Sequence, residues 1–332
     1  MKKLIYIIIA SALALAACEK TLDFPFEYKQ PKLVLNCTLS PTEPIKFTMS
    51  RSMHALDSKD IVFISDADVV IFEDDKPLQV VPFSAPSGLY WTTYIPKAGH
   101  TYKFQISKEG FETIEAETKI AEPTSINGLS GKIKGEDGIY NGYFDVNLNF
   151  NDNPDEENYY FIYTTTEFPP EMEEYNSDYK LDLECNDLSV NRSYDRELLY
   201  LADEIISNGN YTLKFQANDY YTDVYGPYYE IEYYNYNGNE GENITENPEI
   251  EDLPFYREFE YRLIVHVASI NKDYYQYLKS FDLYNENEGN PFAEPTLVKT
   301  NVKNGLGILG SISEVTDTLK FVIKNPYLEE EK

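Results

Sequence analysis

The sequence predicts a mainly β protein, with an N-terminal immunoglobulin-like β-sandwich followed by a larger β-sandwich domain that carries one packed α-helix. Two observations predict this fold. Short segments in which apolar and polar residues alternate recur along the chain, and turn residues such as those at 74–77 and 108–110 separate them. One segment, at about residues 271–284, instead repeats its apolar side chains with the spacing of an amphipathic helix.

The first sandwich is predicted over residues 31–122. Its first strand places Leu33, Leu35, Cys37 and Leu39 on one face, because side chains two residues apart point the same way in a strand. About seven strands in about 90 residues is the number and spacing typical of an immunoglobulin-like sandwich. The expected strands are 33–39, 45–51, 67–73, 78–83, 89–94, 102–107 and 113–120, and the turn at 74–77 makes the third and fourth a hairpin.

The second domain is predicted over residues 123–325, and residues 326–332 read as an acidic tail. Alternation predicts strands at 144–150, 159–166, 211–215, 263–267, 296–302, 308–312 and 319–323. The helix is expected to begin after an N-cap at Asn271 and to carry one apolar stripe of Tyr274, Tyr277, Leu278 and Phe281. A weaker pattern at 198–206 also suggests a helix.

The first residues predict export. Lys2 and Lys3 precede an apolar run that ends at Ala17 and is too short to span a bilayer comfortably, so residues 1–17 read as a removed signal peptide. Residues 15–17 and Cys18 resemble the lipobox of bacterial lipoproteins, which predicts a lipid anchor on Cys18 and a tether over residues 18–30. The alternative is an ordinary secretory peptide with Cys18 incidental. The acidic residues after Cys18 loosely resemble surface-export signals of Bacteroidota lipoproteins. The sequence therefore does not decide on which face of the membrane the protein lies.

The net charge of the chain excludes two classes of binding partner. The formal net charge is -29, and loss of the two lysines of the signal peptide makes it -31. A chain this acidic repels nucleic acid and anionic lipid headgroups, so neither is expected to bind. The two cysteines that remain, Cys37 and Cys185, fall in different predicted domains. A disulfide between them is one alternative, and a buried Cys37 with an exposed Cys185 thiol is the other.

No pattern in the chain has the form of a catalytic or cofactor site. The glycines at 305, 307 and 310 spell a dinucleotide-binding G-x-G-x-x-G, but β-rich sequence follows them, so we expect close packing in a strand. The three histidines lack zinc spacing, and His266 is expected to be semi-buried and structural. No nucleophile motif is present. We therefore expect a non-enzymatic protein that needs no cofactor.

Two further patterns are candidates for binding. Asp152, Asp155 and Glu156 crowd one turn and form a weak calcium candidate, because Ca²⁺ takes oxygen ligands; a solvated hairpin loop is the alternative. Residues 215–256 form an acidic, tyrosine-rich insertion without lysine or arginine, suited to partner contact or sugar stacking, or equally to a β-ribbon that packs on itself. The candidate contact residues of this insertion are Tyr220, Tyr221, Tyr225, Tyr228, Tyr229, Tyr233, Tyr234 and Tyr236.

Several segments resemble a family of Bacteroidota outer-membrane lipoproteins known as domain of unknown function 4249. The resemblance rests on residues 271–278, 290–295 and 301–308, with support from 32–36, 99–110 and 158–160, and it covers essentially the whole mature chain. Residues 169–196 and 219–251 match weakly. Such lipoproteins are thought to accompany TonB-dependent transporters, and the family has no established catalytic residues.

The resemblance implies an accessory lipoprotein, anchored in the outer membrane on its periplasmic or its cell-surface face, that docks on a TonB-dependent transporter or presents ligand to it. Two rivals stay open. A fimbrial subunit would need a maturation site and a C-terminal exchange strand, and a glycan-binding surface lipoprotein is compatible with the tyrosines but weakened by the single tryptophan. The oligomeric state is not predicted.

Overall fold

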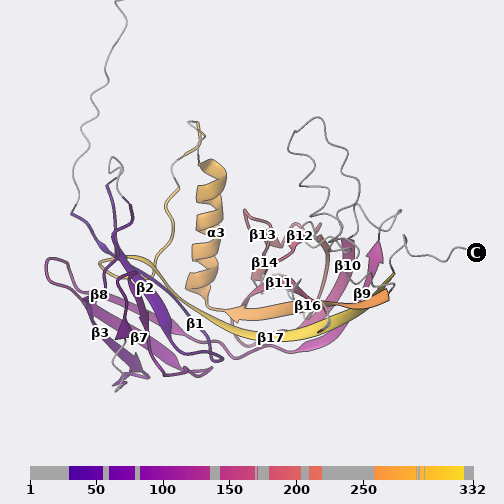
Figure 1. Cartoon of the computed structure of the whole chain (residues 1–332), viewed down its shortest axis with the longest axis horizontal. Helices are drawn as coiled ribbons and strands as arrows, with labels where there is room; N and C mark the ends of the chain where they lie inside the picture. Colours follow the sequence, from indigo (N-terminus) through magenta and orange to yellow (C-terminus); the bar gives the residue numbers. More distant parts are fainter. Residues whose placement is uncertain are drawn as a thin grey trace, which may run out of the picture.

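The described part of the chain folds into three β-sheets and a protruding helix (Figure 1). The computed structural model describes residues 30–54, 60–78, 83–134, 143–168, 170, 179–202, 209–218, 258–288, 290, 292–294 and 296–324. Strands dominate these residues and one α-helix, α3 (Lys272–Asn287), is present among them. The predicted fold class, mainly β with sandwiched sheets and one packed helix, is confirmed. The helix ends three residues later than expected.

The largest sheet runs through both halves of the chain. In hydrogen-bonding order its strands are β13 (Asn191–Arg192), β14 (Leu199–Ala202), β11 (Tyr159–Glu167), β16 (Glu258–Ile270), β17 (Leu306–Lys324), β1 (Leu33–Leu39), β2 (Lys46–Arg51), β6 (Leu89–Trp91) and β5 (Phe83–Ser84).

A four-stranded sheet packs on each end of this large sheet. In the first half its order is β4 (Lys76–Pro77), β3 (Asp68–Glu73), β7 (Thr101–Ser107) and β8 (Ile114–Lys119). In the second half its order is β12 (Asp182–Glu184), β15 (Asn210–Asn218), β10 (Tyr143–Asn151) and β9 (Ile126–Lys134).

Each half has its own core, formed by the side chains that the alternation pattern places inward. In the first half Tyr102, Phe104 and Ile106 are fully buried with the inward residues of β1 and β8. In the second half Leu263, Val265 and Val267 of β16 face the inward residues of β10 and β15. Burial of apolar area on this scale is the main stabilising contribution to folding.

Strand β17 links the two halves. Its residues 306–311 pair in parallel with β1, and its residues 312–324 pair antiparallel with β16 on the opposite edge. In Figure 1 it crosses below the helix as the long yellow strand. The expected strands 308–312 and 319–323 are thus two parts of one continuous strand. The expected strand at 296–302 is wrong: this segment lacks strand structure and returns from the end of α3 to β17.

Two other local predictions are corrected. Residues 199–202, expected to be helical, form β14, because Leu199 and Leu201 enter the second core on one face while Tyr200 packs under α3 on the other. In the hairpin after β3 the turn is only Asp74 and Asp75, both with positive φ, so β4 begins at Lys76. Paired positive φ values match the right-handed twist of hairpin strands.

Cys37 and Cys185 are both free thiols. Cys37 is buried in the first core, whereas Cys185 packs partly against the second. The alternative of a disulfide between them is excluded by this separation. Gly307 and Gly310 lie inside β17 at close approaches to Leu35 and Tyr274, so the G-x-G-x-x-G pattern reflects packing, as expected.

Candidate partner-binding surface

The start of α3 is fixed to the large sheet by Asn271. Its backbone is extended, as at an N-cap, but its side chain makes no cap hydrogen bond. Instead Asn271 Oδ1 accepts hydrogen bonds from the backbone N–H of Ser311, at 3.0 Å, and from the Ser311 hydroxyl, at 3.4 Å. Asn271, which was expected to cap the helix, therefore bonds the backbone of β17 at Ser311, next to the last residue of β17 that pairs with β16.

The first turns of α3 lie on the sheet through aromatic and aliphatic side chains. Tyr274, Tyr275 and Leu278 pack against Phe161 and Ile270 in a small third core. The predicted apolar stripe is therefore only partly buried. Tyr277 stacks on Phe281 with ring centroids 5.9 Å apart, and Phe281 itself is 40% exposed.

Asp282 holds the far half of the helix. It is buried, and its Oδ2 accepts a hydrogen bond of 2.6 Å from the Tyr200 hydroxyl while its Oδ1 accepts one of 3.1 Å from the backbone N–H of Tyr194. Burial, and then the bond to Asp282, raises the pKa of Tyr200. Sequence periodicity could not find this residue, because an aspartate on a helix ordinarily marks the solvated face.

Beyond Asp282 the free end of α3 is covered with exposed apolar side chains. Phe281, Leu283 and Tyr284 flank or oppose Asp282 around the helix, because successive residues are about 100° apart. Phe292 and Leu297 follow in the segment that returns to β17. Their exposed fractions, in chain order, are 40%, 49%, 44%, 94% and 86%. These five residues are called the α3 surface below.

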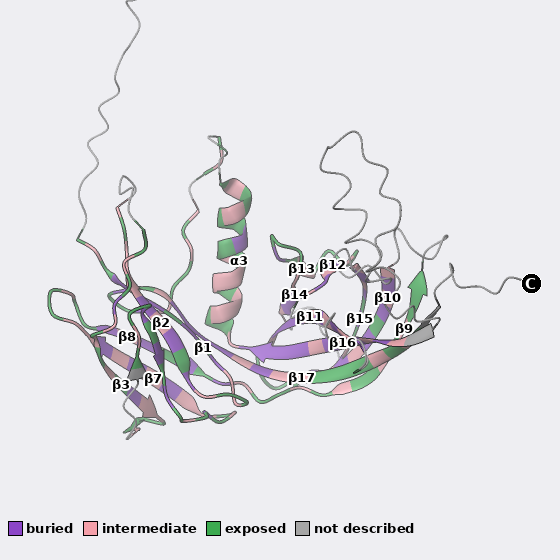
Figure 2. Cartoon of the chain, in the orientation of Figure 1, coloured by how far each residue is buried: buried purple, intermediate pink, exposed green. Residues whose placement is uncertain are grey.

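The α3 surface is carried on an anchored scaffold. Asn287 Nδ2 donates to Thr296 Oγ1 at 3.0 Å, and the backbone N–H of Lys299 donates to Ser280 Oγ at 2.8 Å, so the returning segment is tied back to the helix. Figure 1 shows α3 standing out from the sheets, and Figure 2 shows how much of it is exposed or only half-buried. A gathering of exposed apolar residues on an anchored, protruding element is typical of an interaction site.

A cavity of about 500 Å³ lies at the foot of α3, between the two halves of the chain. Its walls include Lys119 and Glu122 from the first half and Glu156, Glu157 and Lys272 from the second. Lys272 Nζ and Glu157 Oε2 form an ion pair of 2.7 Å. The walls therefore mix both charges, and they hold no arrangement of nucleophile and base.

The three carboxylates of the calcium candidate do not come together as ligands. Asp152 is buried and its Oδ1 accepts a hydrogen bond of 2.8 Å from the Tyr160 hydroxyl, whereas Asp155 and Glu156 are exposed. Within the described ranges, no group of three or more histidine, cysteine, aspartate or glutamate side chains could hold a metal ion.

His266 occupies a structural position on the outer face of β16. Its Nδ1 lies 2.9 Å from Glu314 Oε1, its Nε2 lies 2.9 Å from Thr165 Oγ1, and its ring stacks on Tyr163 at 4.1 Å. Burial acts to raise the pKa of Glu314, but hydrogen bonds from His266 and Tyr163 outweigh it and lower the pKa. Both ring nitrogens are engaged, in keeping with the semi-buried role expected for this histidine.

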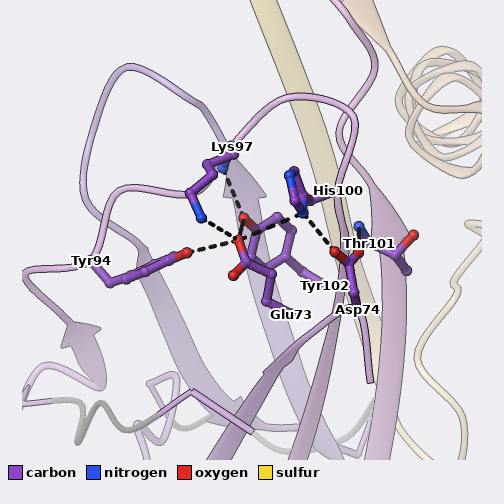
Figure 3. A network of polar contacts seen from close by, with 7 residues as sticks. All are labelled: Glu73, Asp74, Tyr94, Lys97, His100, Thr101 and Tyr102. Atoms are coloured by element: carbon purple, nitrogen blue, oxygen red, sulfur yellow. Dashed lines mark hydrogen bonds and ion pairs between the residues drawn. The ribbon is translucent and has the colours of Figure 1, made fainter. Parts of the chain in front are cut away.

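A second polar network is centred on Glu73, at the end of β3 (Figure 3). Glu73 Oε1 accepts hydrogen bonds from the hydroxyls of Tyr94 and Tyr102, each at 2.7 Å, and from Lys97 Nζ at 3.3 Å. Its side chain is only 17% exposed. Burial acts to raise the pKa of Glu73, but these hydrogen bonds outweigh it, so the pKa is held below its usual range.

We expect Glu73→Gln to destabilise the first sandwich by about 1–3 kcal/mol at neutral pH, because two tyrosine hydroxyls and Lys97 lose a charged acceptor. Because the pKa of Glu73 is lowered in the folded state, its charge stabilises the fold at pH values above the unfolded pKa of about 4.3. This stabilisation is lost as the pH falls through the folded pKa. The difference between the two proteins should therefore narrow below about pH 4 in denaturant titrations.

The matched control is Asp75→Asn, which changes a carboxylate in the adjacent turn that lies outside the network of Figure 3. It should leave the unfolding midpoint nearly unchanged at every pH. An equal loss of stability in both variants would contradict a specific role for Glu73.

Several predicted site residues lie outside the described residues. They are Cys18 and all eight tyrosines from Tyr220 to Tyr236. The α3 surface, by contrast, was not found from the sequence, although Phe281 was placed on the helix. Within the part of the chain that the structure describes, no helix is long and apolar enough to cross a membrane.

The comparison with known proteins agrees with the resemblance noted in the sequence. No curated protein matches the chain. The family model described as domain of unknown function (DUF4249) matches residues 19–318, which include both sandwiches, α3 and most of β17. The chain therefore belongs to the DUF4249 family.

Proposed function

We propose that this protein is a non-catalytic accessory lipoprotein of a Bacteroidota bacterium. A lipid on Cys18 anchors it in the outer membrane, on the periplasmic or the cell-surface face, and the α3 surface docks on a TonB-dependent transporter to hold or present its ligand. The observation that carries the proposal is the exposed apolar end of α3, fixed through Asp282 and Asn271 to the large sheet.

The rigidity of α3 favours docking over a packing role. Folding tends to bury side chains such as Phe281 on α3 and Phe292 on the returning segment, so their exposure on this anchored element costs free energy unless a partner covers them. Large aromatic side chains at the centre of a contact contribute most of the binding free energy in known interfaces. A helix presented in this way can insert into a groove of the partner.

The charges around the α3 surface indicate the chemistry of the partner. Glu286, Glu288 and Glu294 are exposed beside its apolar residues. Acidic residues at the rim favour a partner whose apolar groove is bordered by lysine or arginine, and they disfavour an anionic lipid surface. The tyrosines of residues 215–256 remain candidates for a further part of the same contact.

The experiment is co-purification of the full chain after mild crosslinking in its native outer membrane. Phe281→Ser combined with Phe292→Ser should reduce the recovered transporter at least tenfold, since removing two central anchors costs about 1–2 kcal/mol or more each. Recovery is measured by quantitative mass spectrometry relative to the lipoprotein.

Val70→Ser serves as the matched control, because Val70 is 42% exposed on β3 in the first sandwich and lies away from α3. It should leave recovery unchanged. If no transporter is recovered with the unaltered protein, or if the α3 variant recovers as much as the control, docking through α3 is wrong.

A further inference from the structure

The edge of β17 that faces away from β16 is open over the last part of the strand. Residues 306–311 have β1 on this edge, but β1 ends at Leu39, opposite Ser311. The thirteen residues 312–324 pair with β16 on the other edge. Among the described residues no strand pairs with their free edge. Figure 2 shows the middle of this stretch of β17 as exposed and much of the rest as half-buried.

The backbone groups that face the open edge can be identified from their hydrogen bonds. The N–H of Ser311 points toward the β16 side, since its acceptor Asn271 directly follows β16. Backbone groups alternate along a strand, so even-numbered residues face the open edge. The N–H of Thr318 agrees with this, because it donates to the side chain of the neighbouring Asp317, at 2.8 Å, rather than to β16. The backbone groups of alternate residues from 314 to 322 thus face outward, and among them the N–H of Thr318 is already bonded to the side chain of Asp317.

This edge differs from the other sheet edges in the described part of the chain. The edge strands β4, β5, β12 and β13 have two or three residues, too few to form a pairing template. Strand β9 carries Lys132 and Lys134 and has a register shift against β10. Strand β8 is partly covered by its bridge to Lys303. Bulges, lysines and short length are the usual protection of edges. Strand β17 also carries Lys320 and Lys324 in its open stretch, but it is longer than the other edge strands and keeps one regular register with β16 over thirteen residues.

We propose that the open edge of β17 pairs with the same edge of a second copy of this chain. The two strands run antiparallel about a two-fold axis near Thr318, the middle of residues 312–324, which gives the longest overlap. The two large sheets then form one continuous sheet, with the first sandwiches at opposite ends. This pairing is independent of the proposed docking through α3.

The charged and apolar side chains of residues 312–324 favour a second copy of the chain as the partner and an antiparallel pairing. Glu314 and Asp317 lie in the first half of the open stretch and Lys320 in the second half. With the axis at Thr318, antiparallel pairing places Glu314 of each copy diagonally between Lys320 and Lys324 of the other, whereas parallel pairing would align like charges, which is unfavourable. On the core side, Leu319 and Phe321 pack against the second core beside Gly131 of β9 but stay partly exposed, and a neighbouring strand would cover the exposed part.

The first test is a cysteine at the two-fold axis. Facing residues in a hydrogen-bonded antiparallel pair have Cα atoms about 5.5 Å apart, a distance that a disulfide bridges well. In the full chain, Thr318→Cys should therefore form a disulfide-linked dimer under mild oxidation. Asn36→Cys is the control, because Asn36 is exposed on β1, which is paired on both sides. Crosslinking of Thr318→Cys no greater than that of Asn36→Cys overturns the proposal.

The second test is reversible association of the unaltered full chain, measured in detergent by sedimentation equilibrium. Thr316→Pro should weaken dimerisation at least tenfold, because it removes an outward N–H while leaving the bonds to β16 in place. Thr316→Val keeps that N–H and should associate like the unaltered chain. Added salt should strengthen the dimer, because it screens the repulsion between two strongly acidic chains.

Two outcomes would contradict the second-copy proposal. One is a monomer at every concentration and salt level. The other is a crosslink from position 318 to a different protein, which would make the edge a docking site for a foreign strand. Neither outcome affects the experiment with the α3 variants, which measures how much transporter is recovered. Failure of this proposal and failure of the proposed function can therefore be told apart.

Discussion

Cys18→Ser should release the protein from the membrane fraction. The thioether of a lipoprotein forms on sulfur, so a serine at this position cannot receive the lipid. Each buried methylene contributes about 0.8 kcal/mol to membrane binding, and two or more chains therefore hold the protein durably. We expect the unaltered protein to take up an alkyne-labelled fatty acid and to sediment with the outer membrane. The variant should do neither.

Cys185→Ser is the matched control, because it removes the only other partly exposed thiol in the described residues and leaves Cys18 intact. It should keep both the label and the membrane association. If instead the mature unaltered protein begins at residue 18 with an unmodified cysteine, the chain has an ordinary secretory peptide and the anchor is not on Cys18. Docking would then need another means of retention at the membrane.

Gly307→Ala should cause the largest loss of stability of any conservative change in β17. Gly307 has φ +93, and a Cβ there would lie 2.0 Å from the carbonyl oxygen of Leu35. The conformation is strained for any L side chain, and the clash is with backbone of the paired strand, which cannot move alone. We expect a loss of about 3–5 kcal/mol, measured as a lower denaturation midpoint of the full chain.

Gly110→Ala separates the two causes. Gly110 has φ +85, but a Cβ there meets nothing within 4 Å. This control should therefore show only the conformational cost, about 1 kcal/mol. The excess in Gly307→Ala measures how closely β17 packs against β1. Because β17 also pairs with β16, we expect the second half of the molecule to lose stability together with the first. Equal effects of the two substitutions would contradict this account.

The elements that could be predicted are those whose pattern is local. Strand β7 alternates buried Tyr102, Phe104 and Ile106 with half-buried polar residues, and the sequence alone predicted it. The helix was predicted for the same reason, since its periodicity is contained in a few turns. The error at 199–202 also has a local cause: a short strand buried on both faces has no alternation, so its pattern resembles that of a helix.

The candidate surfaces could not be predicted, because they depend on contacts between distant residues. Phe281 was expected to be buried on the stripe of α3, and only the hydrogen bonds of Asp282 to Tyr200 and Tyr194 turn that stripe partly outward. The open edge of β17 depends on where β1 ends, more than 260 residues earlier in the chain. Nothing in the sequence around Thr318 distinguishes an edge strand from a central one.

The sequence by itself determined the fold class, the inward faces of the strands, the single helix and the family, because each of these depends on periodicity or on short motifs. Its charge also predicts that nucleic acid and anionic lipid do not bind. The tertiary structure alone decided that β17 joins both sandwiches into one sheet, that α3 protrudes with its apolar end exposed, and that residues 312–324 of β17 have no second pairing strand among the described residues. The physical reason is that strand pairing and side-chain capping satisfy backbone groups between segments far apart in the chain, and no local pattern records which segments meet.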